Sequence, residues 1–317
     1  MNSKHCPYCH FNTETIKFGV TSSKRQRYRC KTCKRTWTSK PHPQILAKNI
    51  WYDMVFRNMN MHELARKYKM SERNVRRKLD LYEPPEIVPN EEDKSTTVIA
   101  MDVTYFGRSW GILTALNVHT GKPLYSAPTR GYEAVWDYEQ AIIFLHKYGI
   151  EPKAVIIDGK KGVIEMLEDY GMKVQFCQFH QLKIITQCLT RKPILEPNIV
   201  LRNIALSLTH TKYETFERAL YIWKMNNELW LRERTKLENS KWEYTHKLTR
   251  RAINSLIHNL PYLFTFEKYP ELNIPNTNNR IEGLHSDLKR RLSNHRGLKK
   301  EQKIHFIRIF LSGGTGV

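Results

Sequence analysis

The sequence lacks several features that would assign it to large classes of protein. No apolar stretch approaches the roughly 20 residues needed to span a bilayer. The first residues, Met-Asn-Ser-Lys-His-Cys-Pro, contain no hydrophobic signal region, so a cytoplasmic location is the default expectation. A phosphate-cradling segment of the form Gly-x4-Gly-Lys-Ser/Thr is also missing, which disfavours an ATP-driven reaction.

Cysteine and acidic residues are both scarce. Six cysteines in 317 residues are too few for a disulfide scaffold, and four of them form two tight pairs. The 31 acidic residues are outnumbered by 52 basic ones, which gives a net charge of +21 and a pI near 9.7. A surplus of this size favours a polyanionic partner, most often nucleic acid. With 40% hydrophobic residues the chain can bury a core, and its length favours two or three domains.

The two cysteine pairs lie in the first forty residues and have the spacing of a zinc site. Pairs of the form Cys-x2-Cys on tight turns can together hold one tetrahedral zinc ion. The intervening segment has strand-like character and a basic run over 24–29, so residues 1–40 are expected to form a zinc ribbon. Chance pairs and a redox dithiol are the alternatives, and His5 and His10 are either second-layer partners or exposed side chains. The predicted ligands are Cys6, Cys9, Cys30 and Cys33.

Residues 41–85 show helical spacing of apolar side chains, interrupted at 58–60. Two short helices across a turn, with Ser71 as the N-cap of the second, resemble a helix-turn-helix that places its second helix against DNA. Lys69 occupies a turn position that often carries glycine. A basic helical hairpin that packs only on its own protein is the alternative, and the proline-rich acidic residues 86–96 are the expected linker. The residues expected to contact DNA are Arg73, Asn74, Arg76, Arg77 and Lys78.

Two apolar strands carry a single aspartate each. Asp102 lies in the run 98–106, which is apolar on both faces and is therefore expected to be a central strand. Asp158 ends the run 155–158, and Gly159 behind it permits a sharp turn. A buried carboxylate is costly unless it is paired or coordinated. Asp102 could simply cap a turn or meet an arginine, but two strand-borne aspartates predict one cation site assembled from both strands.

The order of elements from residue 97 onward predicts the fold. Strands over 98–106, 110–118 and 124–127 form an antiparallel meander, and a helix, a strand, a short helix and a fifth strand over 173–177 follow. This order is that of a ribonuclease-H-like fold, an α/β class with a mixed sheet, here assigned to 97–180 together with 275–310. In that arrangement the first and fourth strands are neighbours, so Asp102 and Asp158 are expected to meet.

The segment 181–274 loses strand character and is expected to be an all-helical insertion whose aromatic residues form a core rather than a base-stacking platform. Cys177 and His180 precede it, and two such residues alone do not make a zinc site. A helix follows the insertion, with its buried stripe at Ile281, Leu284, Leu288 and Leu292 and with Glu282 in its first turn. Glu282 could be a surface ion pair, because the cations Lys289, Arg290 and Arg291 follow it.

These motifs resemble those of DDE transposases from bacterial insertion sequences, in the clade related to Mutator elements. Asp102 in Met-Asp-Val-Thr-Tyr-Phe-Gly and Asp158 in Ile-Ile-Asp-Gly-Lys-Lys-Gly match the first two acids of that family. Glu282 in Asn-Thr-Asn-Asn-Arg-Ile-Glu-Gly matches the third, and Cys177 with His180 matches its Cys-x2-His motif. The similarity covers most of 98–308, and Val103 departs from the glycine found in many relatives.

The resemblance implies a polynucleotidyl transferase that cuts element ends and joins their 3′-hydroxyls to target DNA. Two Mg²⁺ or Mn²⁺ ions suit this in-line chemistry and the hard carboxylate ligands. The hypothesis is that Asp102 bridges both ions, while Asp158 and Glu282 each hold one; by resemblance, His180 would orient the scissile phosphate. The zinc ribbon and the helix-turn-helix would find the terminal inverted repeats, the helix with Lys289, Arg290 and Arg291 would grip DNA backbone, and a nucleoid-associated dimer or larger assembly is expected.

Two other functions fit parts of the sequence. A zinc-ribbon and helix-turn-helix regulator would need only the first ninety residues and would leave both strand aspartates unexplained. A nuclease on the same fold would share the metal site but would not join strands. Metal-dependent strand transfer between two DNA molecules separates these hypotheses, and DNA binding is expected to depend strongly on salt.

Overall fold

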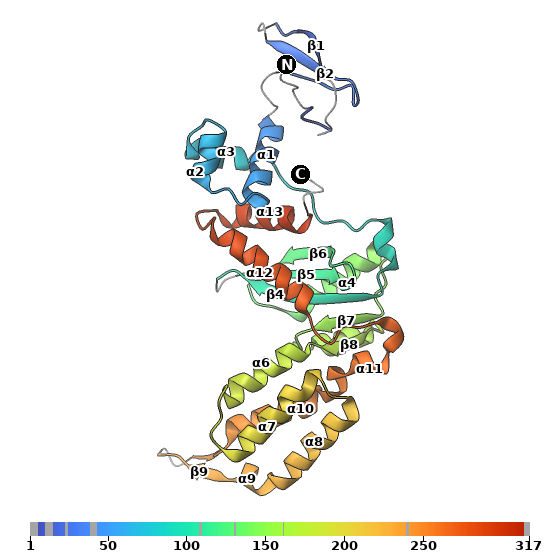
Figure 1. Ribbon diagram of the computed structural model, residues 1–317, viewed down its shortest axis with the longest axis vertical. Helices are drawn as coiled ribbons and strands as arrows, with labels where there is room; N and C mark the ends of the chain where they lie inside the picture. Colours follow the sequence, from blue (N-terminus) through green and yellow to red (C-terminus); the bar gives the residue numbers. More distant parts are fainter. Residues whose placement is uncertain are drawn as a thin grey trace. The chain divides into compact units, whose positions relative to one another are not determined.

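The computed structural model describes residues 6–9, 15–22, 25–38, 43–107, 110–129, 131–160, 162–238 and 241–313. His5 and His10 lie outside these residues. The chain divides into two compact units (elements labelled in Figure 1): unit 1 comprises Met1–Glu86 and Ser286–Val317, and unit 2 comprises Ile87–His285. The boundary divides the segment 275–310, which the sequence assigned to one domain, inside helix α12 (Asn279–Ser293). No helix among the described residues is both long and apolar enough to cross a membrane.

Unit 1 begins with a small antiparallel sheet followed by three helices. The sheet has the order β1-β2-β3, with β2 paired to both neighbours. The predicted helices form as expected: Ser71 Oγ accepts the N–H of Asn74 at 3.3 Å and caps α3. Lys69 adopts a φ of +51° in the turn before it, so the turn forms with a left-handed residue although glycine is absent. The elements are β1 Thr15–Val20, β2 Gln26–Cys30, β3 Thr36–Thr38, α1 Pro43–Val55, α2 Met61–Lys67 and α3 Glu72–Leu79.

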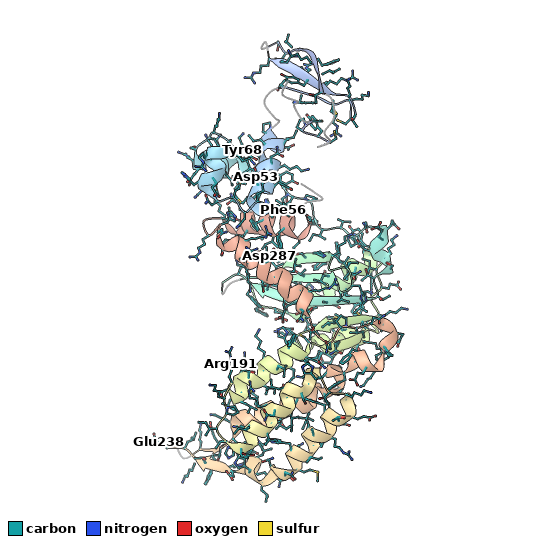
Figure 2. All side chains as sticks on the ribbon, viewed as in Figure 1. Asp53, Phe56, Tyr68, Arg191, Glu238 and Asp287 are labelled. Carbon is teal, nitrogen blue, oxygen red and sulfur yellow. The ribbon has the colours of Figure 1, made fainter. Side chains whose placement is uncertain are left out.

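A buried carboxylate ties the helices of unit 1 together. Asp53 on α1 is 3% exposed and accepts a hydrogen bond from the Tyr68 hydroxyl at 2.6 Å (Figure 2). The Lys67 ammonium contacts the same carboxylate, and the Arg57 guanidinium lies 3.0 Å from it. Two cations and a hydroxyl offset the cost of burying this charge.

The C-terminal residues of unit 1 pack on the N-terminal helices. Helix α13 (Lys300–Leu311) contacts α1, and the Gln302 amide donates to Asp80 Oδ1 at 2.8 Å beyond the end of α3. Trp51 of α1 stacks edge-on against His305 of α13, and its indole N–H donates to the Leu79 carbonyl at 3.1 Å. The two ends of the sequence therefore share one core.

Unit 2 is built on a mixed five-stranded sheet with the order β6-β5-β4-β7-β8. Strands β4, β5 and β6 are antiparallel, whereas β4, β7 and β8 are parallel. The predicted order of strands and helices and the predicted adjacency of the first and fourth strands are confirmed. The elements are β4 Val98–Tyr105, β5 Gly111–Asn117, β6 Pro123–Pro128, α4 Val135–Lys147, β7 Ala154–Ile157, α5 Val163–Asp169 and β8 Lys173–Phe176.

Both faces of this sheet are covered, as the apolar pattern of β4 predicted. Ile99 and Met101 pack in the cluster that includes side chains of α4 and α5. Val98 and Ala100 point into the opposite cluster, which includes Ile281 of α12. The segment before β4, predicted as linker, contains a 3-10 turn, η1 (Glu91–Ser95).

The insertion is mostly helical, but the prediction that it contains only helices is wrong. A short antiparallel hairpin pairs β9 (Arg234–Lys236) with β10 (Trp242–Tyr244). Strands of three residues are too short to show a strand period in sequence. Phe216 is buried as predicted, whereas Trp242 is 62% exposed. The helices are α6 Gln178–Leu189, α7 Glu196–Leu206, α8 Tyr213–Asn226, α9 Glu228–Arg232, α10 Lys247–Leu263 and α11 Thr265–Lys268, with 3-10 turns η2 Ser207–Thr209 and η3 Pro270–Leu272.

Candidate functional site

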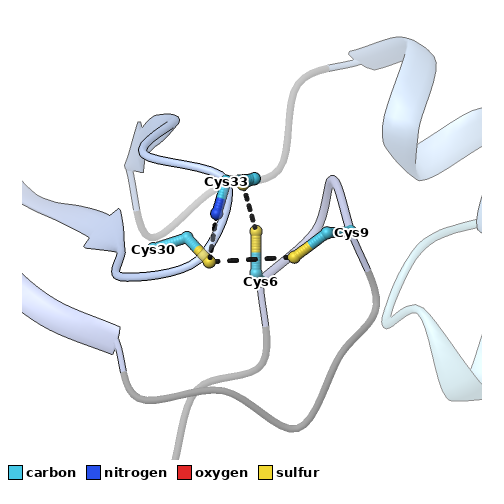
Figure 3. A group of neighbouring side chains, drawn as sticks. All are labelled: Cys6, Cys9, Cys30 and Cys33. Carbon is cyan, nitrogen blue, oxygen red and sulfur yellow. Dashed lines mark hydrogen bonds between the residues drawn. The ribbon is translucent and has the colours of Figure 1, made fainter.

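The four predicted zinc ligands converge in unit 1. The Sγ atoms of Cys6 and Cys33 are 3.6 Å apart, and those of Cys9 and Cys30 are 3.7 Å apart (Figure 3). In a tetrahedral site with zinc–sulfur bonds of about 2.3 Å, two sulfurs lie about 3.8 Å apart. Backbone N–H groups also point at the sulfurs, from Tyr8 to Cys6 and from Cys33 to Cys30, each at 3.4 Å. The cluster could hold one structural zinc ion.

Asp102 lies on β4 opposite Thr114 of β5, and His285 of α12 contacts both. His285 Nδ1 is 3.0 Å from Asp102 Oδ2, and its Nε2 is 3.2 Å from Thr114 Oγ1. Because a carboxylate only accepts, the neutral imidazole that suits both contacts carries its proton on Nδ1 and accepts the Thr114 hydroxyl proton at Nε2. His285 is 4% exposed, so the ring is locked between two strands and a helix.

The sequence prediction did not single out His285. It lies four residues after Ile281 and three before Leu288, so it belongs to the buried stripe of α12, where the prediction placed Leu284. Leu284 is only half-buried. A histidine inside an otherwise apolar helical stripe, one turn after a candidate acid, was the available signal.

Asp158 directly follows β7 and is held in an unusual local conformation. Gly159 has a φ of +86°, and a Cβ at this position would lie 1.8 Å from the Phe176 ring, so only glycine fits. The Oδ1 atom of Asp158 is buried and has no hydrogen-bond partner among the described residues. An oriented but unsatisfied carboxylate oxygen is therefore built into the end of β7.

Charges around Asp158 favour its protonated form. Burial, together with the negative charges of Asp102 and Glu133, raises the pKa of Asp158 to about 6, whereas His180 lowers it. Asp102 and Asp158 are thus electrostatic neighbours, as expected from adjacent strands. Glu133, which the sequence did not single out, is positioned by the Tyr138 hydroxyl, which donates to its Oε1 at 2.7 Å.

Glu282 lies beside Cys177 and His180. The potential ligand atoms of these three residues all lie within 4.8 Å of one another, and His180 Nδ1 is 3.4 Å from Glu282 Oε1. The segment before α12 is tied to the start of α6: the Asn278 N–H donates to Cys177 Sγ at 3.3 Å, and the Asn276 amide donates to Gln178 Oε1 at 3.0 Å. These contacts bring Glu282 to residues that precede it by about one hundred positions.

The three predicted acids do not form a group in which one carboxylate oxygen of each lies within 4.8 Å of the others. Among the described residues, only the four-cysteine cluster and the group of Cys177, His180 and Glu282 meet that limit with one ligand atom per residue. The three acids are instead connected through pairwise interactions. Asp102 is close enough to Asp158 to raise its pKa, and His180 acts on Asp158 while lying beside Glu282. His180 therefore interacts electrostatically with Asp158 and lies beside Glu282.

The residues predicted to contact DNA differ in their surroundings. On α3, Val75 and Leu79 face the core, which leaves Arg73, Asn74, Arg76 and Arg77 exposed and Lys78 half-buried. Lys289 and Arg290 are exposed on α12. Arg291 is engaged internally: its Nε donates to Asp287 at 2.9 Å, and one terminal nitrogen donates to the carbonyls of Val55 and Phe56. These contacts favour a structural role for Arg291.

Comparison with models of known protein families finds no match to this chain, and comparison with curated protein sequences finds no relative.

Proposed function

We propose that the protein is a DNA transposase of the DDE type, with a ribonuclease-H-like catalytic domain that cleaves the ends of an insertion sequence and joins their 3′-hydroxyls to target DNA. The observation that carries the proposal is the placement of Asp102 on β4 and of Asp158 directly after β7, the parallel neighbour of β4. The mixed sheet, with three antiparallel strands followed by two parallel ones, supports the fold assignment. Glu282 supplies the third acid from α12.

The carboxylates fit divalent cations such as Mg²⁺ or Mn²⁺. The buried, unpartnered Oδ1 of Asp158 and its raised pKa are what a cation would relieve, because a bound cation favours the ionised carboxylate. Asp102, Asp158 and Glu282 would hold the two ions, with Asp102 contributing to both and Asp158 and Glu282 to one each. Asp158 and Glu282 then need not touch, since two such ions lie about 3.5–4 Å apart.

Two ions held there would stabilise both the attacking and the leaving oxygen of an in-line displacement at phosphorus. The protein's own residues would provide the positions. His285 orients Asp102 through Nδ1, and Gly159 allows the turn that orients Asp158. His180, beside Glu282, would orient the scissile phosphate. Water, and then the freed 3′-hydroxyl, would be the nucleophile.

Recognition of the terminal inverted repeats is assigned to unit 1. Helix α3 presents Arg73, Asn74, Arg76 and Arg77 on its exposed face, as the recognition helix of a helix-turn-helix does. The four-cysteine zinc ribbon adds a second small module, and Lys289 and Arg290 offer backbone contacts. The net charge of +21 supports a polyanionic partner, and assembly as a dimer or larger complex on DNA is part of the proposal.

The test begins by selecting duplexes that the purified protein binds from a random pool. Selected DNA is then labelled and incubated with protein, a second unlabelled duplex and Mg²⁺ or Mn²⁺, and it is scored for nicking and joining. Asp102→Ala, Asp158→Ala and Glu282→Ala should each abolish both products while the protein remains folded. Asp169→Ala, which removes an exposed carboxylate from α5, is the matched control and should retain activity.

The outcomes separate the three functions. Joining that depends on the metal and on all three acids supports a transposase. Nicking without joining would instead indicate a nuclease on the same fold. Selective binding without any strand cleavage would indicate a regulator and would overturn the proposal.

A further inference from the structure

Three side chains of the types that bind metal ions converge at the start of α6. Cys177 and His180 come from the end of β8 and the first turn of α6, and Glu282 comes from the first turn of α12. Their ligand atoms lie within 4.8 Å of one another. Cysteine, histidine and glutamate differ in chemistry, but all three are ordinary ligands of zinc.

The measured separation fits a shared ion. In a tetrahedral site with zinc–nitrogen and zinc–oxygen bonds of about 2.0–2.2 Å, the nitrogen and oxygen ligands lie about 3.4 Å apart. His180 Nδ1 and Glu282 Oε1 are 3.4 Å apart. His180 Nδ1 is buried and makes no hydrogen bond among the described residues. It is close enough to Glu282 Oε1 for an ion pair, but the two groups are not aligned for a hydrogen bond. A simple histidine–glutamate pair would be expected to form that hydrogen bond.

The sulfur of Cys177 is surrounded by backbone N–H donors. The Asn278 N–H points at it from 3.3 Å, and the backbone N–H groups of Phe179 and His180 also donate to it. N–H groups point at cysteine sulfurs in the same way in the four-cysteine cluster, which is arranged for zinc.

The other buried cysteine of unit 2 provides the contrast. Cys188 lies near the end of the same helix, α6, and is 6% exposed. It belongs to no group of three ligand-type residues among the described parts of the chain. A buried cysteine in this unit therefore need not lie close to both a histidine and a carboxylate, as Cys177 does.

We propose that Cys177, His180 and Glu282 bind one zinc ion and leave its fourth position open to water or to an oxygen of a phosphate. A thiolate and an imidazole in the ligand set favour zinc over magnesium or calcium. Three protein ligands with an open position are typical of reactive rather than purely structural zinc sites. The carboxylate has a second oxygen, Oε2, which remains free for another partner. Zinc binding here does not depend on the proposed transposase function.

Zinc content per chain provides the direct test. The full chain is purified with a thiol-free reductant and without chelators, incubated with zinc in the presence of a large excess of magnesium to occupy the proposed carboxylate site, desalted and measured by plasma mass spectrometry. The expected content is two zinc ions per chain, one in the four-cysteine cluster and one at this site. Cys177→Ser and His180→Ala should each lower it to one, and Glu282→Gln should weaken the second site by at least about tenfold. Cys188→Ser is the matched control and should keep two.

Cobalt substitution identifies the ligands independently. In a Cys6→Ser/Cys9→Ser chain, which lacks half of the ribbon cluster, bound Co²⁺ should show a weak thiolate-to-cobalt charge-transfer band. That band should disappear on adding Cys177→Ser and persist on adding Cys188→Ser. Circular dichroism shows whether each variant is folded, and His180→Ala replaces Cys177→Ser if the latter is not.

Some outcomes would overturn the inference. One zinc ion per wild-type chain after zinc loading, unchanged by Cys177→Ser or His180→Ala, leaves only a histidine–glutamate ion pair at this position. None of these measurements uses DNA. Failure to cleave or join DNA therefore bears on the proposed function alone, and a missing second zinc bears on this site alone.

Discussion

His285 of α12 bridges Asp102 and Thr114: its Nδ1 lies 3.0 Å from Asp102 Oδ2 while its Nε2 lies 3.2 Å from Thr114 Oγ1. Asp102 and Thr114 face each other across β4 and β5, so one ring spans a strand pair and fixes the orientation of the carboxylate. Outer partners that orient a metal-binding carboxylate affect metal affinity strongly, even though they do not touch the ion.

Replacing His285 with alanine should therefore have two effects. Loss of the hydrogen-bonding ring from a buried position should lower the free energy of unfolding by about 1–3 kcal/mol. Loss of carboxylate orientation should weaken Mn²⁺ binding by about 10–100-fold. Urea unfolding without Mn²⁺ measures the first effect, and calorimetric titration with Mn²⁺ measures the second. His258→Ala, at an exposed histidine of α10, is the control, and an unchanged Mn²⁺ affinity in His285→Ala would refute the positioning role.

The raised pKa of Asp158 predicts how stability depends on pH. In the folded protein the pKa is about 6, against an ordinary value of 3.8, so the folded state binds an extra proton between these values. The stabilisation is fully present below pH 3.8 and is lost as the pH rises through 6. The difference between the two pKa values corresponds to about 3 kcal/mol.

The corresponding variant is Asp158→Asn, studied by urea unfolding from pH 4 to pH 7.5 without magnesium or manganese. The wild type should lose stability relative to the variant across this range, because only the wild type must bury an ionised carboxylate at neutral pH. Asp169→Asn removes an exposed carboxylate and should leave the slope unchanged. A wild-type curve parallel to that of Asp158→Asn would contradict the assigned cause.

The order of elements in unit 2 could be predicted because it depends on local patterns. The side chains of β4 point alternately into two apolar clusters, and β7 is an unbroken apolar run. Both strands could therefore be identified from their runs of apolar residues. The adjacency of Asp102 and Asp158 followed from that order. The pairing of β9 with β10 could not be predicted, because each strand has only three residues and most of their side chains are exposed.

Contacts between distant segments were harder to predict. The apolar pattern of α12 does not indicate that Glu282 lies beside Cys177 and His180. That proximity depends on the hydrogen bonds that the Asn278 N–H and the Asn276 amide donate to the start of α6. Packing of α13 on α1 could not be predicted either. The apolar face of an amphipathic helix shows that the face must be buried, but it does not show which element buries it.

Exposed arginines of α3 should govern DNA affinity through charge. Arg73→Ala and Arg77→Ala should each weaken binding to a selected duplex and reduce the slope of log affinity against log salt concentration by about one if the side chain contacts a phosphate. A base contact would instead relax the selected sequence and leave the slope nearly unchanged. Fluorescence anisotropy over a salt series measures both quantities. Lys147→Ala, at an exposed lysine of α4, should change neither, and equal effects of all three substitutions would argue for nonspecific charge alone.

Arg291 and Arg290 are neighbours with different expected roles. Arg291 joins Asp287 to the carbonyls of Val55 and Phe56 at the end of α1, and 24% of its side chain is exposed. Among the described residues, Arg290 pairs with Asp287 alone, and 67% of its side chain is exposed. The planar guanidinium of Arg291 donates in two directions at once, which a lysine ammonium on a flexible stem reproduces poorly.

Arg291→Lys should therefore lower the free energy of unfolding of unit 1 by about 1–2 kcal/mol, because buried carbonyl acceptors at the C-terminal end of α1 lose their donors. Arg290→Lys, which keeps the charge on an exposed side chain, should change it by less than about 0.5 kcal/mol. Native-state hydrogen exchange of the α1 amides, followed by mass spectrometry, measures the opening free energy of this unit in each variant. In DNA binding, Arg290→Ala should reduce the salt slope, whereas Arg291→Lys should leave it unchanged. Equal stability of the two lysine variants would place Arg291 on the DNA-binding surface instead.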